Sequence, residues 1–195
     1  MLEQNHSPLN VQSRVLNRKL SIELYSHLMF GRMINRTHFI EGRLASNPLF
    51  EELLNNFDQY RTIYDLIGYE LVMRDGFVFL RTADAAEVEK DDIARSFQGL
   101  LLVLFRGVLE MGYTMDVLLR DEAGLSDTWI EEIGKGQDKV EVLIACGMKS
   151  GNLLEHVKKL EARSVAYRNA KGNLVLTEAG AGFFNDLLGE GDLTL

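Results

Sequence analysis

Two pairs of short apolar segments, each closed by a turn that contains glycine, constrain the fold of this chain more than any other feature. Residues 70–80 form two apolar runs around Asp75-Gly76. Asp-Gly between apolar runs is typical of a β-hairpin, because glycine readily adopts the positive φ that a tight turn requires. Residues 165–176 form a second such pair around Gly172. We therefore expect two small antiparallel hairpins, with their turn glycines 96 residues apart.

Helical periodicity surrounds both hairpins. Apolar residues between positions 11 and 33 recur at steps of about four and seven, in a stripe wide enough to predict burial on more than one side. Asn47-Pro48 predicts the start of a second helix, because proline suits a first helical turn. Further helices are expected over 60–67, 93–111, 115–121, 126–133, 152–163 and 178–188. Segment 139–146 fits a helix, and its pattern also permits a strand.

Three polar residues mark expected helix starts in the second half of the chain. They are Ser126, Asn152 and Thr177, whose side-chain oxygens can accept hydrogen bonds from free amides of a first turn. Each predicted hairpin also follows a helix. Helices followed by a two-stranded hairpin describe a winged-helix unit.

The expected fold class is therefore mainly α with small β-hairpins (α+β), arranged as tandem winged-helix domains. We place the first domain at residues 11–85 and the second at 86–188. The segments 1–10 and 189–195 are expected to be a flexible N-terminus and a flexible tail.

Motifs for catalysis, cofactors and metals are missing from the sequence. Residues 147–150 (Gly-Met-Lys-Ser) lack the first glycine that the phosphate-binding GxxxxGK[ST] spacing requires. The four histidines fall at no metal-ligand spacing, and Cys146 has no nearby cysteine. We therefore expect no enzyme, no catalytic residue, no bound cofactor and no metal. Cys146 lies on an apolar segment and is expected to be a packing residue.

The charge of the chain argues against direct recruitment to nucleic acid. Its net charge is −8, and residues 86–195 hold nineteen acidic side chains against twelve Lys and Arg. A DNA contact therefore needs a local patch, or a complex whose other members supply positive charge. A single cysteine suits a reducing cytoplasm. The longest apolar run, Leu100–Phe105, is too short to span a membrane, so we expect a cytoplasmic protein without membrane contact.

The best local patch for DNA phosphates surrounds the second hairpin and the helix before it. Its candidate residues are Lys149, Lys158, Lys159, Arg163, Arg168 and Lys171. In winged-helix proteins that helix commonly enters the major groove while the wing contacts the backbone. The alternative is an ordinary solvated helix face, because Glu155 and Glu161 dilute the positive charge.

Two apolar features also have two interpretations each. Phe77 and Phe79 lie on one face of a strand, either as core residues or as part of a groove for a partner. The helix predicted within 11–33 either caps the first domain or packs on a partner protein or a second copy of the chain.

Several short motifs and the order of the elements resemble a known family. The motifs are Asn47-Pro48-Leu49-Phe50, Tyr69-Glu70-Leu71-Val72 and, after the turn with Gly76, Phe77-Val78-Phe79-Leu80-Arg81. With the order of elements from Met29 to Leu188, they resemble the MukE and MksE proteins, accessory subunits of bacterial condensins.

The resemblance implies a homodimeric, non-catalytic subunit that binds a kleisin of the MksF or MukF type. Its complex would contain an SMC ATPase of the MksB or MukB type, and it would lie at the nucleoid. The implied roles are DNA condensation in chromosome organisation and segregation, or plasmid defence, with a possible DNA contact inside the complex. The alternative is a stand-alone winged-helix transcription regulator, which usually carries a basic face that a net charge of −8 does not favour.

Overall fold

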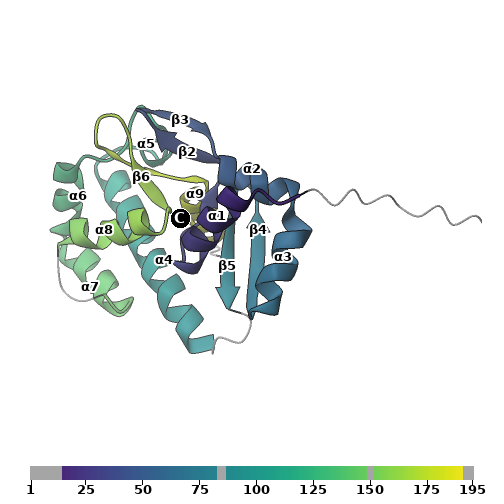
Figure 1. Ribbon diagram of the computed structural model, residues 1–195. Coiled ribbons are helices and arrows are strands. Elements are labelled where there is room, and N and C mark those ends of the chain that lie inside the picture. The colour runs from purple at the N-terminus through teal and green to yellow at the C-terminus, as the bar shows by residue number, and fades with distance from the viewer. Residues whose placement is uncertain (1–14, 83–86, 149–151, 191–195) are drawn as a thin grey trace, which may run out of the picture.

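The computed structural model describes residues 15–82, 87–148 and 152–190, which form two units that lie side by side (Figure 1). The first unit lies at the right of Figure 1 and the second at the left, with a small hairpin above the seam between them. The first unit contains α1 (Arg18–Met29), β1 (Ile34–Asn35), β2 (Thr37–Ile40), β3 (Arg43–Ser46), α2 (Pro48–Asn55), α3 (Phe57–Leu66), β4 (Tyr69–Arg74) and β5 (Phe77–Thr82). The predicted N-terminal segment 1–10 lies outside the described residues.

Helix α2 and the first hairpin form where the sequence predicts them. Asn47 caps α2 by accepting a hydrogen bond from the backbone N–H of Leu49 at 3.0 Å, and Pro48 occupies the first turn. Strands β4 and β5 pair antiparallel up to Arg74 and Phe77, and Gly76 closes the turn with φ +87°. Strand β1 adds to the free edge of β5, which gives the strand order β1-β5-β4.

The second unit has a related order, in which helices again precede a two-stranded hairpin. It contains α4 (Glu87–Glu110), α5 (Asp116–Leu119), α6 (Asp127–Gly134), α7 (Gln137–Ala145), α8 (Leu153–Ala162), β6 (Ala166–Arg168), β7 (Leu174–Leu176) and α9 (Glu178–Glu190). An isolated antiparallel bridge between Leu125 and Leu174 takes the place of the pairing between β1 and β5. The mainly α fold with small hairpins and tandem winged-helix units is confirmed.

The predicted caps of the second unit are also confirmed. Ser126 accepts a hydrogen bond from the N–H of Trp129, and Asn152 accepts one from that of Leu154. The N–H of Gly180 donates to the Thr177 hydroxyl at the start of α9. The segment that permitted either helix or strand is the helix α7. Cys146 follows α7 and packs, partly buried, against the core of the second unit, as expected.

Helix α1 is shorter than predicted, and its burial is one-sided. Asn17 caps it, since its side chain accepts hydrogen bonds from two amides of the first turn, and the helix ends at Met29 rather than at residue 33. Residues 11–14 lie outside the described part of the chain. Leu24 is buried, whereas Ile22 and Tyr25 are 59% and 53% exposed. Within the described residues α1 itself is therefore buried on one side, against the first unit's core, whereas Met33, at the end of the predicted stripe, packs against the second unit's core.

A third hairpin, β2–β3, was missed by the sequence analysis. Its strands pair from Thr37 with Ser46 to Ile40 with Arg43. The turn residues Glu41 and Gly42 both have positive φ, at 51° and 78°, which is the signature of a type I′ turn. The signal in the sequence was a lone Glu-Gly between two four-residue runs, which is weaker than Asp-Gly because glutamate rarely adopts positive φ.

Two hydrophobic clusters fill the two units, and residues of α9 pack against the second cluster. Leu24, Leu53 and Val78 belong to the first cluster, and Leu104 and Leu160 belong to the second. Each cluster excludes water from one winged-helix unit, which is the main source of its stability.

Helix α9 joins the second unit to the wing of the first. The ring centroid of Phe183 lies 5.4 Å from that of Phe77 and 6.2 Å from that of Phe79. A Cβ atom added at Gly182 would lie 2.7 Å from the Phe77 ring, so glycine permits this close approach. Because Phe77 is only 1% exposed, the core interpretation of this strand face is confirmed for Phe77.

The buried side chain of Asn35 bridges the two units. It is 4% exposed, and its Nδ2 donates to the carbonyl of Ser164 at 2.7 Å while its Oδ1 accepts from the N–H of Ala179 at 2.9 Å. The N–H of Met33 donates to the carbonyl of Arg163 at 2.9 Å beside it. Both polar ends of a buried amide are thereby satisfied across the seam.

We predict that Asn35→Ala lowers the free energy of unfolding by about 2–3 kcal/mol, because the buried N–H of Ala179 loses its acceptor. Urea denaturation checks this value. The matched control is Asn185→Ala, an exposed asparagine on α9, for which we expect a change within about 0.5 kcal/mol. Equal losses in both variants would show that Asn35 does not have the role assigned to it.

Candidate functional site

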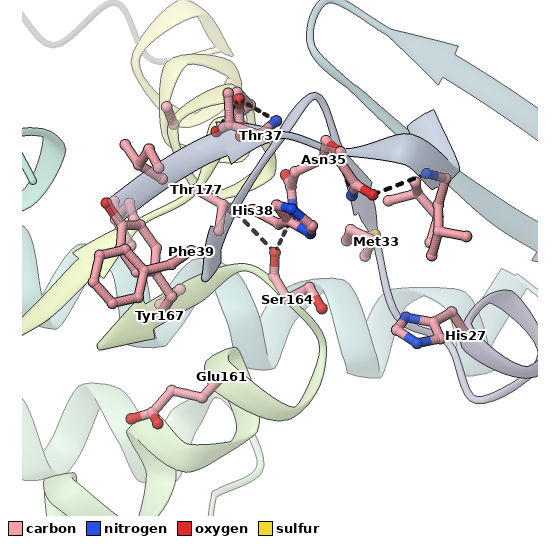
Figure 2. Close-up of a pocket in the computed structure, with 18 of the residues that line it drawn as sticks. His27, Met33, Asn35, Thr37, His38, Phe39, Glu161, Ser164, Tyr167 and Thr177 are labelled. Carbon is pink, nitrogen blue, oxygen red and sulfur yellow. Dashed lines mark hydrogen bonds between the residues drawn. The ribbon is translucent and has the colours of Figure 1, made fainter. Parts of the chain in front are cut away.

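A cleft of about 770 Å³ lies between the two units (Figure 2). The first unit contributes residues of α1, β1, β2 and β3 and the start of α2, and the second contributes residues of α5, α8, β6, β7 and α9. The volume lies within the range of ligand-binding pockets. Because both units supply walls, the cleft has this shape only when they sit in the arrangement that Asn35 holds.

An aromatic pair forms one wall of the cleft. Figure 2 shows Phe39 of β2 lying against Tyr167 of β6, and their ring centroids are 5.3 Å apart. The Tyr167 hydroxyl donates to the Asp121 carboxylate at 2.9 Å. Burial, with the hydrogen bond to Asp121 as a second cause, raises the pKa of Tyr167. The hydroxyl therefore stays protonated at neutral pH and remains a hydrogen-bond donor.

The floor of the cleft is a network of paired polar groups. The carbonyl of Ser164 accepts hydrogen bonds from Asn35 Nδ2 and from the Thr177 hydroxyl, the latter at 2.8 Å. Ser164 itself has φ +58°, at the position after α8 where glycine is commoner. Thr37 donates from its N–H and its hydroxyl to Oε1 of Glu178, at 3.0 and 2.7 Å. These bonds hold β2 to the start of α9.

The described ionisable residues that line the cleft are glutamates, histidines and a tyrosine. They are Glu23, His27, His38, Glu161, Tyr167 and Glu178, and the described lining residues contain no lysine or arginine. Burial lowers the pKa of His27, and the nearby Arg32 lowers it further. The His27 imidazole is therefore neutral at pH 7 and does not offset the carboxylates.

The six predicted DNA-binding residues are not all displayed for contact. Lys149 lies outside the described residues. Lys158 lies on the exposed face of α8, where its Nζ contacts Glu155 at 2.8 Å, and Lys159 is exposed beside it. These two lysines are the candidates that α8 presents outward.

The other three candidates make contacts that hold the fold. Arg163 donates to the carbonyl of Gly31 in the first unit at 3.1 Å. Arg168, with its side chain 25% exposed, pairs with Asp127 at 2.7 Å and Glu161 at 2.9 Å. Lys171 donates to a backbone carbonyl, that of Glu122. DNA contact by this patch stays a prediction.

The cleft can therefore offer a ligand hydrogen bonds, aromatic contacts and charged groups.

Within the ranges that the structure describes, no cluster of His, Cys, Asp and Glu could hold a metal ion. In the same ranges, no helix combines the length and apolar character that a membrane crossing needs. Sequence reasoning missed the cleft because its walls come from segments far apart in the chain, brought together only by the seam.

Comparison with known proteins identifies one family. The model of the family described as condensin complex protein MksE matches residues 19–188. The match runs from the first turn of α1 into α9 and so includes both winged-helix units. No curated protein matches the chain.

The lowered pKa of His27 predicts a pH dependence of stability. As pH falls through 6.5, the unfolded chain protonates this histidine before the folded protein does, so wild-type stability decreases. His27→Gln removes this contribution. We expect the difference in Tm between the two proteins to be constant above about pH 7.5 and to shift in favour of the variant towards pH 5. Thermal melts from pH 8 to 5 measure this difference, and a pH-independent difference would refute the prediction.

Proposed function

This chain belongs to the MksE family of condensin complex proteins, and we propose that it is a non-catalytic accessory subunit that binds the kleisin of a bacterial SMC complex. The observation that carries the proposal is the family match over residues 19–188, which includes both winged-helix units. In this proposal ATP hydrolysis belongs to the SMC-type partner. The subunit supports chromosome organisation and segregation, or plasmid defence, beside the nucleoid in the cytoplasm.

The exposed face of α1 supports a role in protein binding. Ile22 and Tyr25 are more than half exposed and lie three residues apart, so they share one face of the helix. Ser21, next to them, shares a hydrogen bond of 2.8 Å with the hydroxyl of Tyr60 on α3, which fixes α1 against its unit. Aromatic and aliphatic side chains on a rigid surface are typical of the centre of a protein interface.

We further propose a homodimer and a domain boundary between residues 85 and 86. The first cluster draws its buried residues from positions 24–78, and the second draws them from positions 100–176. That separation supports a boundary between β5 and α4, although hydrogen bonds across the seam tie the domains together.

The alternative function is a transcription regulator that binds DNA alone. Its recognition helix would be α8, whose neighbours Arg163 and Arg168 are held by Gly31, Asp127 and Glu161. Arginines held in this way, on a chain of net charge −8, favour the condensin subunit over the regulator. DNA contact by the described candidates is therefore proposed only for the assembled complex.

Co-purification tests the proposed function. We expect the full chain, co-expressed with a kleisin from the same genome, to elute with it as one complex of fixed stoichiometry in gel filtration with light scattering. Ile22→Glu combined with Tyr25→Glu should weaken the complex at least about tenfold, because charge enters the apolar interface. The matched control is Leu109→Glu with Ile144→Glu, two residues of similar exposure on α4 and α7. Separate elution of wild-type chain and kleisin would refute the proposal.

Charge reversal on α8 tests the DNA contact. Lys158→Glu with Lys159→Glu should weaken DNA binding by the assembled complex about tenfold and reduce its salt dependence, while the Tm of the chain is unchanged. The control is Lys19→Glu with Lys135→Glu, which makes the same change of charge on α1 and after α6. An unchanged affinity and salt slope would remove these lysines from the DNA interface. Tight, sequence-selective binding by the isolated chain would instead support the regulator.

A further inference from the structure

The cleft between the two units has apolar walls that remain open to solvent. Leu44 of β3 and Leu119 of α5 line it, and each is about two-fifths exposed, at 43%. Met33 and Leu176 also line it, together with the Phe39–Tyr167 pair. Apolar side chains gathered around a concavity provide packing area for the stem of a long side chain.

The charged groups of this cleft are carboxylates. Glu23 lies on the exposed side of α1, and Glu178 lies where β2 meets α9. The described hydrogen bonds to Glu178 come from neutral donors of Thr37, and Arg36, which lies beside Glu178 in a neighbouring pocket, pairs with Asp75 at 2.7 Å. Glu161 also lines the cleft, and it is balanced by Arg168, which is not a lining residue.

Further carboxylates stand behind the aromatic wall. Asp121 accepts the hydrogen bond from the Tyr167 hydroxyl, and Glu122 lies close enough to act on the same group. Among the residues of the described part of the chain that line the cleft there is neither lysine nor arginine. In a concave site with apolar walls, such an arrangement focuses a negative potential on the ligand.

We propose that this cleft binds an extended segment of a partner protein in which Lys or Arg alternates with apolar residues. The basic heads reach Glu23 and Glu178, while their aliphatic stems and the apolar neighbours pack on Leu44, Leu119 and the Phe39 ring. Nucleic acid is excluded from the cleft by the same carboxylates. The proposal rests on the proposed function in one respect: the occupant is a segment of a protein partner. It adds that this segment lies in the cleft and is held by carboxylates and apolar side chains.

Peptide binding to the full chain tests this assignment. The probe is a fluorescein-labelled peptide, Ala-Leu-Lys-Ala-Lys-Leu-Ala, titrated by fluorescence anisotropy, and the comparison peptide has both lysines replaced by glutamate. We expect the lysine peptide to bind, the glutamate peptide not to bind, and binding to weaken as salt increases. Glu23→Lys should weaken the lysine peptide about fivefold.

The matched control is Glu131→Lys, the same charge reversal at an exposed position of α6 away from the cleft lining. We expect it to change the affinity less than twofold, and thermal melts show whether both variants fold. Absence of lysine-peptide binding, equal binding of the two peptides, or equal weakening by both variants overturns the proposal. If the kleisin co-purifies while the peptide fails, the proposed function stands without this site. If the peptide binds while the kleisin does not co-purify, only the proposed function fails.

Discussion

The relative position of the two winged-helix units depends on one buried amide. Asn35 lies in a strand of two residues, yet its side chain satisfies a carbonyl after α8 and an N–H at the start of α9. Leaving either group unpaired in the interior would be costly, so the units have one favourable register. The next residues of the chain form β2, and Thr37 attaches that strand to Glu178. The contacts between the two units therefore also hold β2 in place, and with it the wall of the cleft that contains Phe39.

The two units share an order of elements and differ in what is inserted into it. In the first unit the β2–β3 hairpin is inserted between β1 and α2. The second unit instead inserts α7 between α6 and α8. The hairpin extends over the seam, where Phe39 reaches Tyr167 of the other unit's wing. A repeated architecture thus carries an asymmetric cleft, one wall of which is formed by an insertion in one unit only.

Local signals in the sequence predicted the elements, and long-range contacts decided the rest. Asp75-Gly76, Pro48 and the caps Asn47 and Ser126 act within a few residues, so the hairpin and helix starts were predictable. The one-sided burial of α1 depends on which core it meets, and the seam joins Asn35 to a carbonyl 129 positions away. The sequence has the same limit for the predicted basic patch. It shows that Arg163 lies near a wing, but not that its side chain is held by the distant carbonyl of Gly31. The cleft had no local signal at all beyond Glu41-Gly42.

Helix α9 follows both wings in the chain, so it leaves the ribosome after the strand that it covers. The first unit leaves the exit tunnel with its wing formed from local segments, but Phe77 lacks the ring of Phe183, and Thr37 and Asn35 lack Glu178 and Ala179. Domains tend to fold as they emerge, N-terminal first. The nascent chain therefore exposes an apolar strand face until α9 has been made. A truncated translation product would keep that face uncovered, which marks it for chaperones and proteases before it can enter an assembly.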